Sequence, residues 1–396
     1  MTIFLGGGFA AKYLDGGGNF SVPLQWMLGL RRLKLDAIWL EHLPSEGNPA
    51  DDQRKIDNFR RQMRAHGLSS RYGLLYHKNP DSAHDLEALE CIGISKRELL
   101  DRLAGPNTLL NLSYSLHPPL LLKFERRIFC DLDPSEIMYW MTRMEMGQST
   151  HHEFWTIGLN VNAPDCKLLT MAPSKLPGMG WSSVQPKQLH WKTFYPLIDT
   201  QLYKPQPRPR SPKFTTIGQW YWGGAVEVDG DFPDLSKKYA FEQYLDLPKR
   251  APKAKFELAM HMSADDPDRD RLKTRGWRVV DPHRVATTPE KYRRYVASAL
   301  AEFTVIKGVD VSWNTGWLSD RAAAFLASGC PVVTGDSGAR KYLPRASGFH
   351  FVRDLESAAA AVQDVLGNWK KRSAEARRCA VEMFDSVENL RKILDL

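Results

Sequence analysis

Short apolar runs alternate with longer segments of helical periodicity along most of the chain. In the first half the pattern predicts strands at 2–5, 36–43, 72–76, 108–112 and 127–130, with helices at 20–33, 51–66 and 95–103. The first strand is followed by two glycine runs, Gly6 to Gly8 and Gly16 to Gly18, and then by a helix. Strand, glycine loop, helix and strand in this order are typical of the opening of a Rossmann-like domain.

A proline-rich stretch interrupts this alternation. Residues 203–213 contain four prolines, four basic residues and no acid. Such a segment cannot form a regular helix and favours extended polyproline geometry. We therefore predict a domain boundary here, with a first domain over 1–205 and a second domain over 206–375.

The alternation resumes after this linker. Strands are predicted at 214–217, 256–260, 277–281, 303–306, 331–334 and 349–352, with helices at 266–275, 289–300 and 319–328. The tail from 355 to 394 has an almost wholly helical pattern with a break near Gly367. Residues 376–396 are predicted to form the C-terminal helix, so the sequence indicates an α/β protein of two domains.

Composition supports two domains and an ordinary globular protein. A chain of 396 residues is too long for one compact core, and 43% hydrophobic with 25% charged residues is a usual balance. No apolar run reaches 18 residues, and the start becomes glycine-rich too soon for a signal peptide. Five scattered cysteines without metal-ligand spacing favour a reducing cytoplasm and no metal site. The net charge of +8 suits an anionic donor, nucleic acid or anionic lipid, and solubility alone is the alternative explanation.

Residues 316–336 are the most informative segment of the chain. Ser319 and Asp320 are favourable first residues of a helix, while Gly329 ends it and Pro331 prevents it from resuming. A buried parallel strand is predicted directly afterwards. The helix start presents free N–H groups and a positive dipole end, which together favour a bound phosphate.

This order of parts resembles the sugar-nucleotide site of glycosyltransferases with the two-Rossmann (GT-B) fold. Blocks at 292–295, 301–307 and 316–321 are similar to successive blocks of a group-1-like glycosyltransferase family, and 131–134 and 154–158 to blocks of its first half. The resemblance implies two Rossmann-like domains that face a cleft, with the C-terminal helix crossing back to the first domain. It also implies transfer of a hexose from a nucleotide sugar, with a UDP-sugar favoured, to a hydroxyl acceptor, without a further cofactor.

The resemblance places the donor at the helix start. We expect Gly316, Ser319 and Asp320 to surround the donor diphosphate, and Arg321 to add a bidentate phosphate contact. The alternative is an ordinary capped helix with Arg321 on the surface. Lys307 ends an apolar strand, and ligands of open α/β sheets bind at that end, so its ammonium also suits a phosphate.

Two further residues are donor candidates. Arg293 lies on the preceding predicted helix and is either a phosphate contact or a surface residue. Many retaining relatives hold the donor ribose with a Glu, and the matching position here is Ala324. Asp320 or Asp336 can take that role, or the ribose is held elsewhere.

Acidic residues after a predicted strand are candidates for the acceptor side. Asp131 and Asp133 point to one side if the strand continues, where they could act as base towards an acceptor hydroxyl. The alternative is a turn that caps a helix starting near Pro134. Asp15 in the first loop is the rival base, and His152 is a weaker candidate near the expected cleft.

Glycines and aromatic residues leave further alternatives open. Gly16, Gly17 and Gly18 open a helix, where they can receive an anion or let the acceptor approach the backbone, but a flexible turn explains them equally well. Residues 220–222 are Trp, Tyr and Trp, which pack a core or stack on a base or a sugar.

The acceptor divides the functional hypotheses. A glycosyltransferase acting on a small molecule or glycan is the first, and one acting on DNA with hydroxymethylated bases, as some phage enzymes do, is the second. The basic linker and the positive net charge favour DNA as a partner. A non-catalytic protein that keeps the fold as a binding module is the third, supported by the missing Glu at Ala324.

Overall fold

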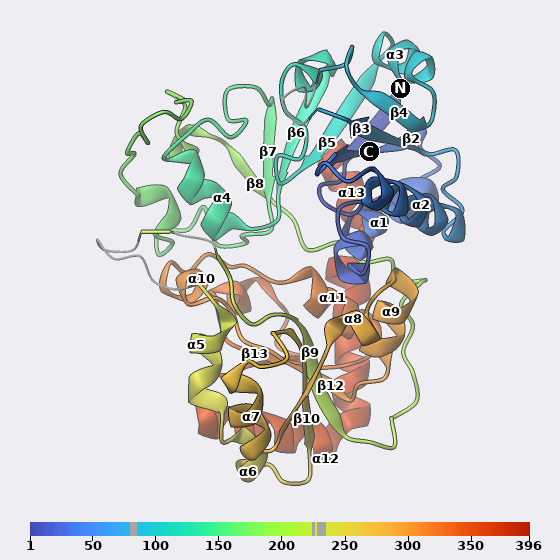
Figure 1. Cartoon of the computed structure of the whole chain (residues 1–396). Helices are drawn as coiled ribbons and strands as arrows, with labels where there is room; N and C mark the ends of the chain where they lie inside the picture. Colours follow the sequence, from blue (N-terminus) through green and yellow to red (C-terminus); the bar gives the residue numbers. More distant parts are fainter. Residues whose placement is uncertain (80–84, 224–225, 228–234) are drawn as a thin grey trace.

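The structure is a computed structural model that describes residues 1–79, 85–223, 226–227 and 235–396. Its strands form two sheets, one in each domain, and Figure 1 shows the domains one above the other. None of the helices in the described residues is long and apolar enough to cross a membrane.

The first domain is built on an eight-stranded sheet in the order β4-β3-β2-β1-β5-β6-β7-β8, parallel except for β4. Its strands are β1 (Thr2–Gly6), β2 (Ala37–Pro44), β3 (Tyr72–His77), β4 (Glu90–Gly93), β5 (Asn107–Leu112), β6 (Arg126–Asp131), β7 (Glu153–Thr156) and β8 (Trp191–Thr193). Its helices are α1 (Gly17–Arg32), α2 (Pro49–Ala65), α3 (Lys96–Leu103) and α4 (Pro134–Met141), with 3₁₀ turns η2 (Leu120–Lys123), η3 (Leu168–Thr170) and η4 (Pro186–Gln188). β1, β3 and β5 are buried throughout, as in parallel sheets covered by helices on both faces.

The second domain has a six-stranded parallel sheet in the order β11-β10-β9-β12-β13-β14. Its strands are β9 (Lys213–Gln219), β10 (Lys255–His261), β11 (Trp277–Val280), β12 (Ala301–Phe303), β13 (Val332–Thr334) and β14 (Phe349–Phe351). Its helices are α5 (Lys237–Phe241), α6 (Leu247–Arg250), α7 (Pro267–Thr274), α8 (Pro282–Val285), α9 (Pro289–Ala297), α10 (Gly308–Ser312), α11 (Asp320–Ala327) and α12 (Leu355–Cys379), with 3₁₀ turns η5 (Glu242–Tyr244) and η6 (Ala339–Tyr342).

Both sheets have the doubly wound strand order. The second sheet runs 3-2-1-4-5-6 in sequence order, and β3-β2-β1-β5-β6-β7 repeats that order in the first. Two Rossmann-like domains are therefore confirmed. The predicted domain boundary falls between β8, the last strand of the first sheet, and β9, the first strand of the second.

Two crossing segments, 198–203 and 380–386, connect the domains and hydrogen-bond to each other. The second contains the π-helical turn η7 (Ala380–Phe384) and the start of α13 (Ser386–Leu394). The Ile198 N–H donates to the Phe384 carbonyl at 2.9 Å, and the Ser386 N–H donates to the Ile198 carbonyl at 2.9 Å. The two crossings thus form one joint.

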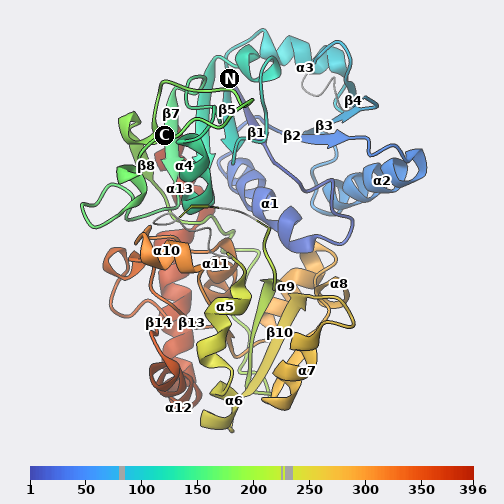
Figure 2. The same cartoon turned by 60° about the vertical axis from the view of Figure 1, so that its left-hand side comes forward.

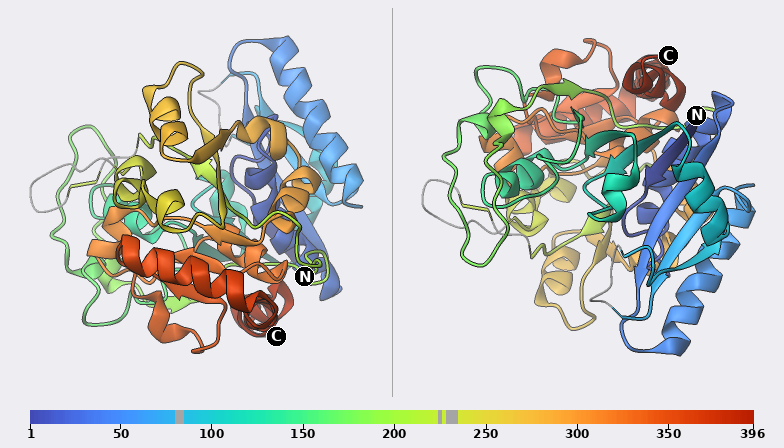
Figure 3. Two further views of the ribbon diagram at one scale, coloured as in Figure 1. Left: turned by 90° about the horizontal axis from the view of Figure 1, so that it is seen from below. Right: turned by 90° about the horizontal axis from the view of Figure 1, so that it is seen from above.

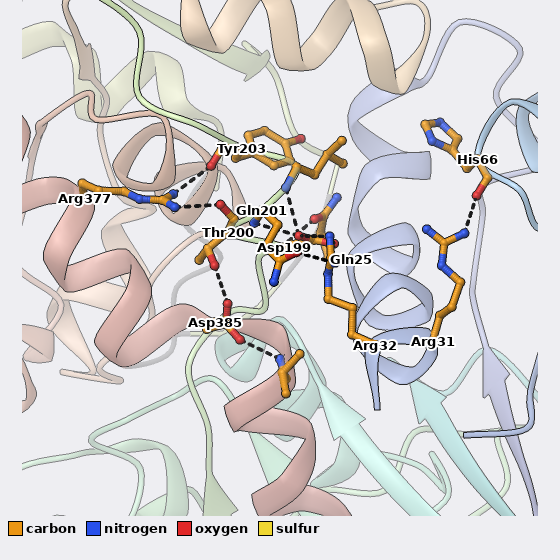
Figure 4. A network of polar contacts seen from close by, with 12 residues as sticks. Gln25, Arg31, Arg32, His66, Asp199, Thr200, Gln201, Tyr203, Arg377 and Asp385 are labelled. Carbon is orange, nitrogen blue, oxygen red and sulfur yellow. Dashed lines mark hydrogen bonds and ion pairs between the residues drawn. The ribbon is translucent and has the colours of Figure 1, made fainter. Parts of the chain in front are cut away.

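Side chains from both domains fix this joint (Figure 4). The Asp199 carboxylate accepts from the Arg32 guanidinium of α1 at 2.9 Å through both oxygens. Arg377 of α12 donates to the carbonyls of Thr200 and Tyr203, each at 2.8 Å. The guanidinium of Arg377, on a helix of the second domain, therefore holds the backbone of the crossing segment 198–203.

The C-terminal helix returns to the first domain, as the resemblance to GT-B glycosyltransferases implies. A Cβ on Gly29 would lie 2.6 Å from Leu390 Cδ1, so α13 packs directly on α1. Leu390, Ile393 and Leu394 belong to the core of the first domain. Both chain termini accordingly lie on that domain in Figures 1 and 2, and Figure 3 shows the two ends near each other.

Some predicted boundaries shift. The break in the tail lies at Asn368, which has φ −115° and ψ 23°, next to the predicted Gly367. The strand predicted at 303–306 is β12, which ends at Phe303. It ends there because the chain turns towards the first domain, which Lys307 contacts.

Candidate functional site

The carboxyl ends of the two sheets face each other across the domain interface. In doubly wound sheets ligands bind outside these ends, where the strand order reverses. That point lies between β1 and β5 in the first sheet and between β9 and β12 in the second. The backbone links the two edges, because the Asn160 N–H donates to the Thr315 carbonyl at 3.1 Å and Gly158 pairs with Trp317.

The loop before α11 is fitted tightly against the first domain. Gly316 has φ +76°, and a Cβ there would lie 2.3 Å from the Asn160 backbone nitrogen. Only glycine combines this backbone conformation with so close an approach. Ser319 caps α11, its Oγ accepting from the Ala322 N–H at 3.1 Å. Asp320 follows the cap, and burial raises the pKa of its carboxyl to about 6.

Arg321 points into the second domain rather than outwards as a free phosphate ligand. Its Nε pairs with Glu302 Oε1, Nη1 donates to the Ile217 carbonyl at 2.9 Å and Nη2 donates to Thr304 Oγ1 at 3.0 Å. Glu302 is fully buried, and its Oε2 has no hydrogen-bond partner among the described residues. The physical reason for this orientation is that a buried carboxylate needs a countercharge, which Arg321 supplies.

A cation that sequence reasoning missed lies beside Arg321. Lys237 is the first residue of α5, and a Cβ on Gly218 would lie 3.3 Å from its Nζ and 4.0 Å from Arg321 Nη1. The part of the chain that the structure describes supplies no ion pair to Lys237. Burial and the neighbouring Arg321 hold the pKa of Lys237 well below its usual range. An anion bound at the end of β9 would restore the charged form.

Lys307 joins the two domains. Its Nζ lies 2.6 Å from Asp133 Oδ2 and 2.6 Å from Glu136 Oε1, both in the first domain. Burial alone would lower the pKa of Lys307, but these two carboxylates outweigh it and raise the pKa above its usual value. The residue expected to contact a phosphate is thus already paired with two carboxylates in this structure.

Asp131 and Asp133 do not point to one side as expected, because β6 ends at Asp131. Asp131 is fully buried and accepts from Thr156 Oγ1 at 2.6 Å and from the Asp133 N–H at 2.8 Å. Burial raises the pKa of Asp131 to about 7. Asp131 therefore fixes the turn that starts α4 and cannot reach a substrate. Asp133, with 32% of its side chain exposed, is the accessible carboxylate.

The second glycine run makes a domain contact. The Gly17 N–H donates to the Ala286 carbonyl at 2.9 Å, and a Cβ on Gly17 would lie 2.3 Å from the same oxygen. A Cβ on Gly18 would lie 3.5 Å from the Tyr292 ring. Gly16 is the N-cap of α1. Of the three glycines, Gly17 is thus required by the close packing of α1 on the second domain.

The first glycine run covers a buried acid that the sequence did not reveal. A Cβ on Gly7 would lie 1.9 Å from Trp39 Nε1 and 2.6 Å from Glu41 Oε2. Glu41 is fully buried and accepts from Trp39 Nε1 at 2.9 Å and from the Ala11 N–H at 3.1 Å. Burial raises the pKa of Glu41 to about 8. This carboxyl therefore fastens the loop after β1.

We expect the titration of Glu41 to lower the free energy of unfolding as the pH rises. Its pKa is about 8 in the folded chain against an ordinary 4.5, so between these values the folded state binds more protons. The free energy of unfolding then decreases as the pH rises through this window, by at most about 1.4 kcal/mol per pH unit. Glu41→Gln should flatten this slope, while losing about 1–3 kcal/mol at low pH because an acceptor is missing. Urea unfolding of both proteins at pH 5.5 and 7.5 measures the slopes, and equal slopes would contradict the assignment.

The other candidates are spread along the same interface. Arg293 is paired with Glu290 on its own helix at 2.8 Å. Asp336 follows β13 and accepts from the Gly338 N–H at 2.9 Å. Asp15 is an exposed residue of the loop before α1.

His152 lies away from the cleft, so its predicted position was wrong. It precedes β7 and therefore sits at the amino end of that strand, the edge opposite to the cleft. The Arg127 N–H donates to its Nδ1 at 3.1 Å. Among the residues that the structure describes, no group of three or more His, Cys, Asp or Glu side chains is arranged to hold a metal ion.

Comparison with known proteins shows the fold. No protein-family model and no curated protein sequence matches the chain. The E. coli trehalose-6-phosphate structure bound with UDP-2-fluoro glucose has a TM-score of 0.56 at 11% identity, covering 100% of this chain and 98% of that one. Anabaena HepE in complex with UDP-glucose has a TM-score of 0.55 at 10% identity, with the same coverage. The N-terminal domain of Candida albicans trehalose-6-phosphate phosphatase has 0.52 at 9%, covering 100% and 95%. The GT-B fold is thereby confirmed.

Proposed function

We propose that this protein is a glycosyltransferase that moves a hexose from a UDP-sugar to a hydroxyl acceptor. The observation behind the proposal is the partly buried Lys237, which has no ion pair among the described residues and lies beside Arg321 and Gly218, at the strand end where a doubly wound sheet binds its ligand. Two of the similar structures hold UDP-glucose or UDP-2-fluoro glucose, which supports this choice of donor.

The proposed chemistry assigns one role to each side of the cleft. The bond between the anomeric carbon and the diphosphate oxygen breaks, and its electron pair leaves with the nucleoside diphosphate. Lys237 stabilises this developing charge, with Gly218 allowing the phosphate to approach the backbone. Asp133 takes the proton of the acceptor hydroxyl as the new bond to the anomeric carbon forms. Lys307, which contacts Asp133, keeps that carboxylate in place.

We expect Lys237→Gln to weaken UDP binding without weakening the fold. Loss of a charged hydrogen bond costs about 1.5–3 kcal/mol, which is roughly a ten- to hundredfold increase in Kd. The unliganded variant should be at least as stable as the wild type, because the charged form of Lys237 is disfavoured by burial. Thermal unfolding with increasing UDP and UDP-glucose measures both quantities.

The neighbouring lysine provides a matched control. Lys238 is paired with Asp268 at 3.0 Å, so Lys238→Gln should leave the Kd for UDP unchanged. An unaltered Kd in Lys237→Gln would remove Lys237 from the donor site. Absence of any stabilisation of the wild type by UDP, GDP and their sugar derivatives would favour a non-catalytic binding protein instead.

DNA as the acceptor is not favoured by the linker contacts. Lys213 is paired with Glu257 at 3.0 Å inside the second domain, and Arg208 donates to the Leu366 carbonyl of α12 at 2.9 Å. Two of the four cations that motivated this hypothesis thus have intramolecular partners. We retain DNA only as an outcome of the acceptor experiment below.

A further inference from the structure

One face of α4 leads away from Asp133 along the first domain. Asp133, Glu136 and Trp140 follow each other at spacings of three and four residues, which places them on the same side of the helix. Glu136 and Trp140 are both partly exposed. The stripe from Asp133 to Trp140 is about 10 Å long at the rise of an α-helix.

An exposed tryptophan of the second domain lies against this stripe. The Trp222 indole N–H donates to Glu136 Oε1 at 2.6 Å, and Lys307 Nζ lies 5.2 Å from the centre of its ring. Trp222 nevertheless remains 44% exposed. A large aromatic side chain that is oriented by two polar contacts and still open to solvent is ready to stack on a ligand.

We propose that this stripe, formed by Asp133, Glu136, Trp140 and Trp222, binds a carbohydrate acceptor of more than one sugar unit. The inference rests on the proposed function, because Asp133 would receive the proton of the reacting hydroxyl. The C–H faces of sugar rings pack on indole rings, and sugar hydroxyls donate hydrogen bonds to carboxylates. The stripe offers both kinds of group along one line that starts at the proposed base.

The charge of the stripe supports a neutral polyhydroxyl ligand over a nucleic acid. Among the described residues Asp133 and Glu136 both form ion pairs with the single cation Lys307, and Glu227 is paired with Arg143 at 3.3 Å. The net charge of these five side chains is therefore negative, whereas binding of a DNA backbone requires clustered cations.

Binding to a glycan array, followed by titration of the bound glycan, tests the proposal. Wild type, Trp222→Ala, Trp140→Ala and Trp222→Phe are compared, with Tyr239→Ala as control, since Tyr239 is a 56% exposed aromatic residue on α5. We expect each alanine variant of the stripe to bind about tenfold or more weakly, at about 1.4 kcal/mol per tenfold change. The phenylalanine variant and the control should bind like the wild type.

The UDP titration, made on the same samples, separates this inference from the proposed function. Unchanged UDP binding with lost glycan binding in the stripe variants supports the proposal. Glycan binding that is equal in all variants overturns it, as does an array without any bound glycan while UDP binds. Tighter binding of duplex DNA than of every glycan at the same salt concentration also overturns it. Failure of UDP to bind the wild type rejects the proposed function, whatever the array shows.

Discussion

Replacement of Arg321 by alanine is expected to lower the free energy of unfolding by about 3–5 kcal/mol, because it leaves a buried carboxylate without its countercharge. In this variant the Oε1 of Glu302 still accepts a hydrogen bond from Thr216 Oγ1 at 2.9 Å, while its Oε2 has no partner among the described residues. The Ile217 carbonyl and Thr304 Oγ1 lose a donor as well. Urea unfolding at neutral pH measures the loss.

Two further variants identify the cause of the stability loss expected in Arg321→Ala. Arg321→Ala combined with Glu302→Gln should be more stable than Arg321→Ala alone, because no uncompensated charge remains. Arg293→Ala removes an exposed pair with Glu290 and should cost at most about 1 kcal/mol. A loss below that size in Arg321→Ala would show that Glu302 does not depend on Arg321.

Asp133→Asn is expected to lower turnover by about 100- to 10,000-fold if Asp133 is the base of the proposed reaction. The amide keeps the shape of the side chain, and Lys307 keeps its second partner, Glu136, at 2.6 Å. UDP binding should therefore remain near that of the wild type. Steady-state transfer to the acceptor, with a parallel UDP titration, measures the two effects.

Asp15→Asn is the matched control, because Asp15 is exposed in the other loop considered for the base. Wild-type turnover in Asp133→Asn together with a slow Asp15→Asn variant would move the base to that loop. Full activity in both variants would favour a reaction without a protein base.

Local signals in the sequence were sufficient to predict those structural features whose determining residues are neighbours in the chain. The start of α11 could be predicted because its cap, Ser319, contacts the Ala322 N–H three residues later. Its end could be predicted because Gly329 adopts φ +74°, which glycine tolerates best. The Rossmann-like alternation of strands and helices followed from the same kind of signal, repeated in each half.

The orientation of Arg321 and the position of Lys237 depend on distant residues. Arg321 is turned inwards by Glu302 of β12, a residue that reads as an ordinary position of a short strand. Residues 220–236 separate Lys237 from β9 in the sequence. The residues next to Lys237 in the chain therefore gave no indication that its side chain lies beside Gly218. The available signal was a pair of lysines after Ser236 at a helix start.

His152 was misplaced because β7 was not recognised as a strand. β7 has four residues and β8 has three, too few for alternation to be detected. A residue before a parallel strand lies at the opposite edge of the sheet from one after it. Recognition of Glu153–Thr156 as a strand would have moved His152 away from the cleft.

The return of α13 to the first domain also decides the order in which the chain can complete its folding during synthesis. Domains generally fold as units as they emerge from the ribosome, the N-terminal one first. Here Leu390, Ile393 and Leu394 belong to the core around α1, so the first domain lacks part of its interior until these residues have been made. Residues 213–379, by contrast, contain the whole second sheet and α12. The second domain can therefore complete its fold before α13 is available to the first domain.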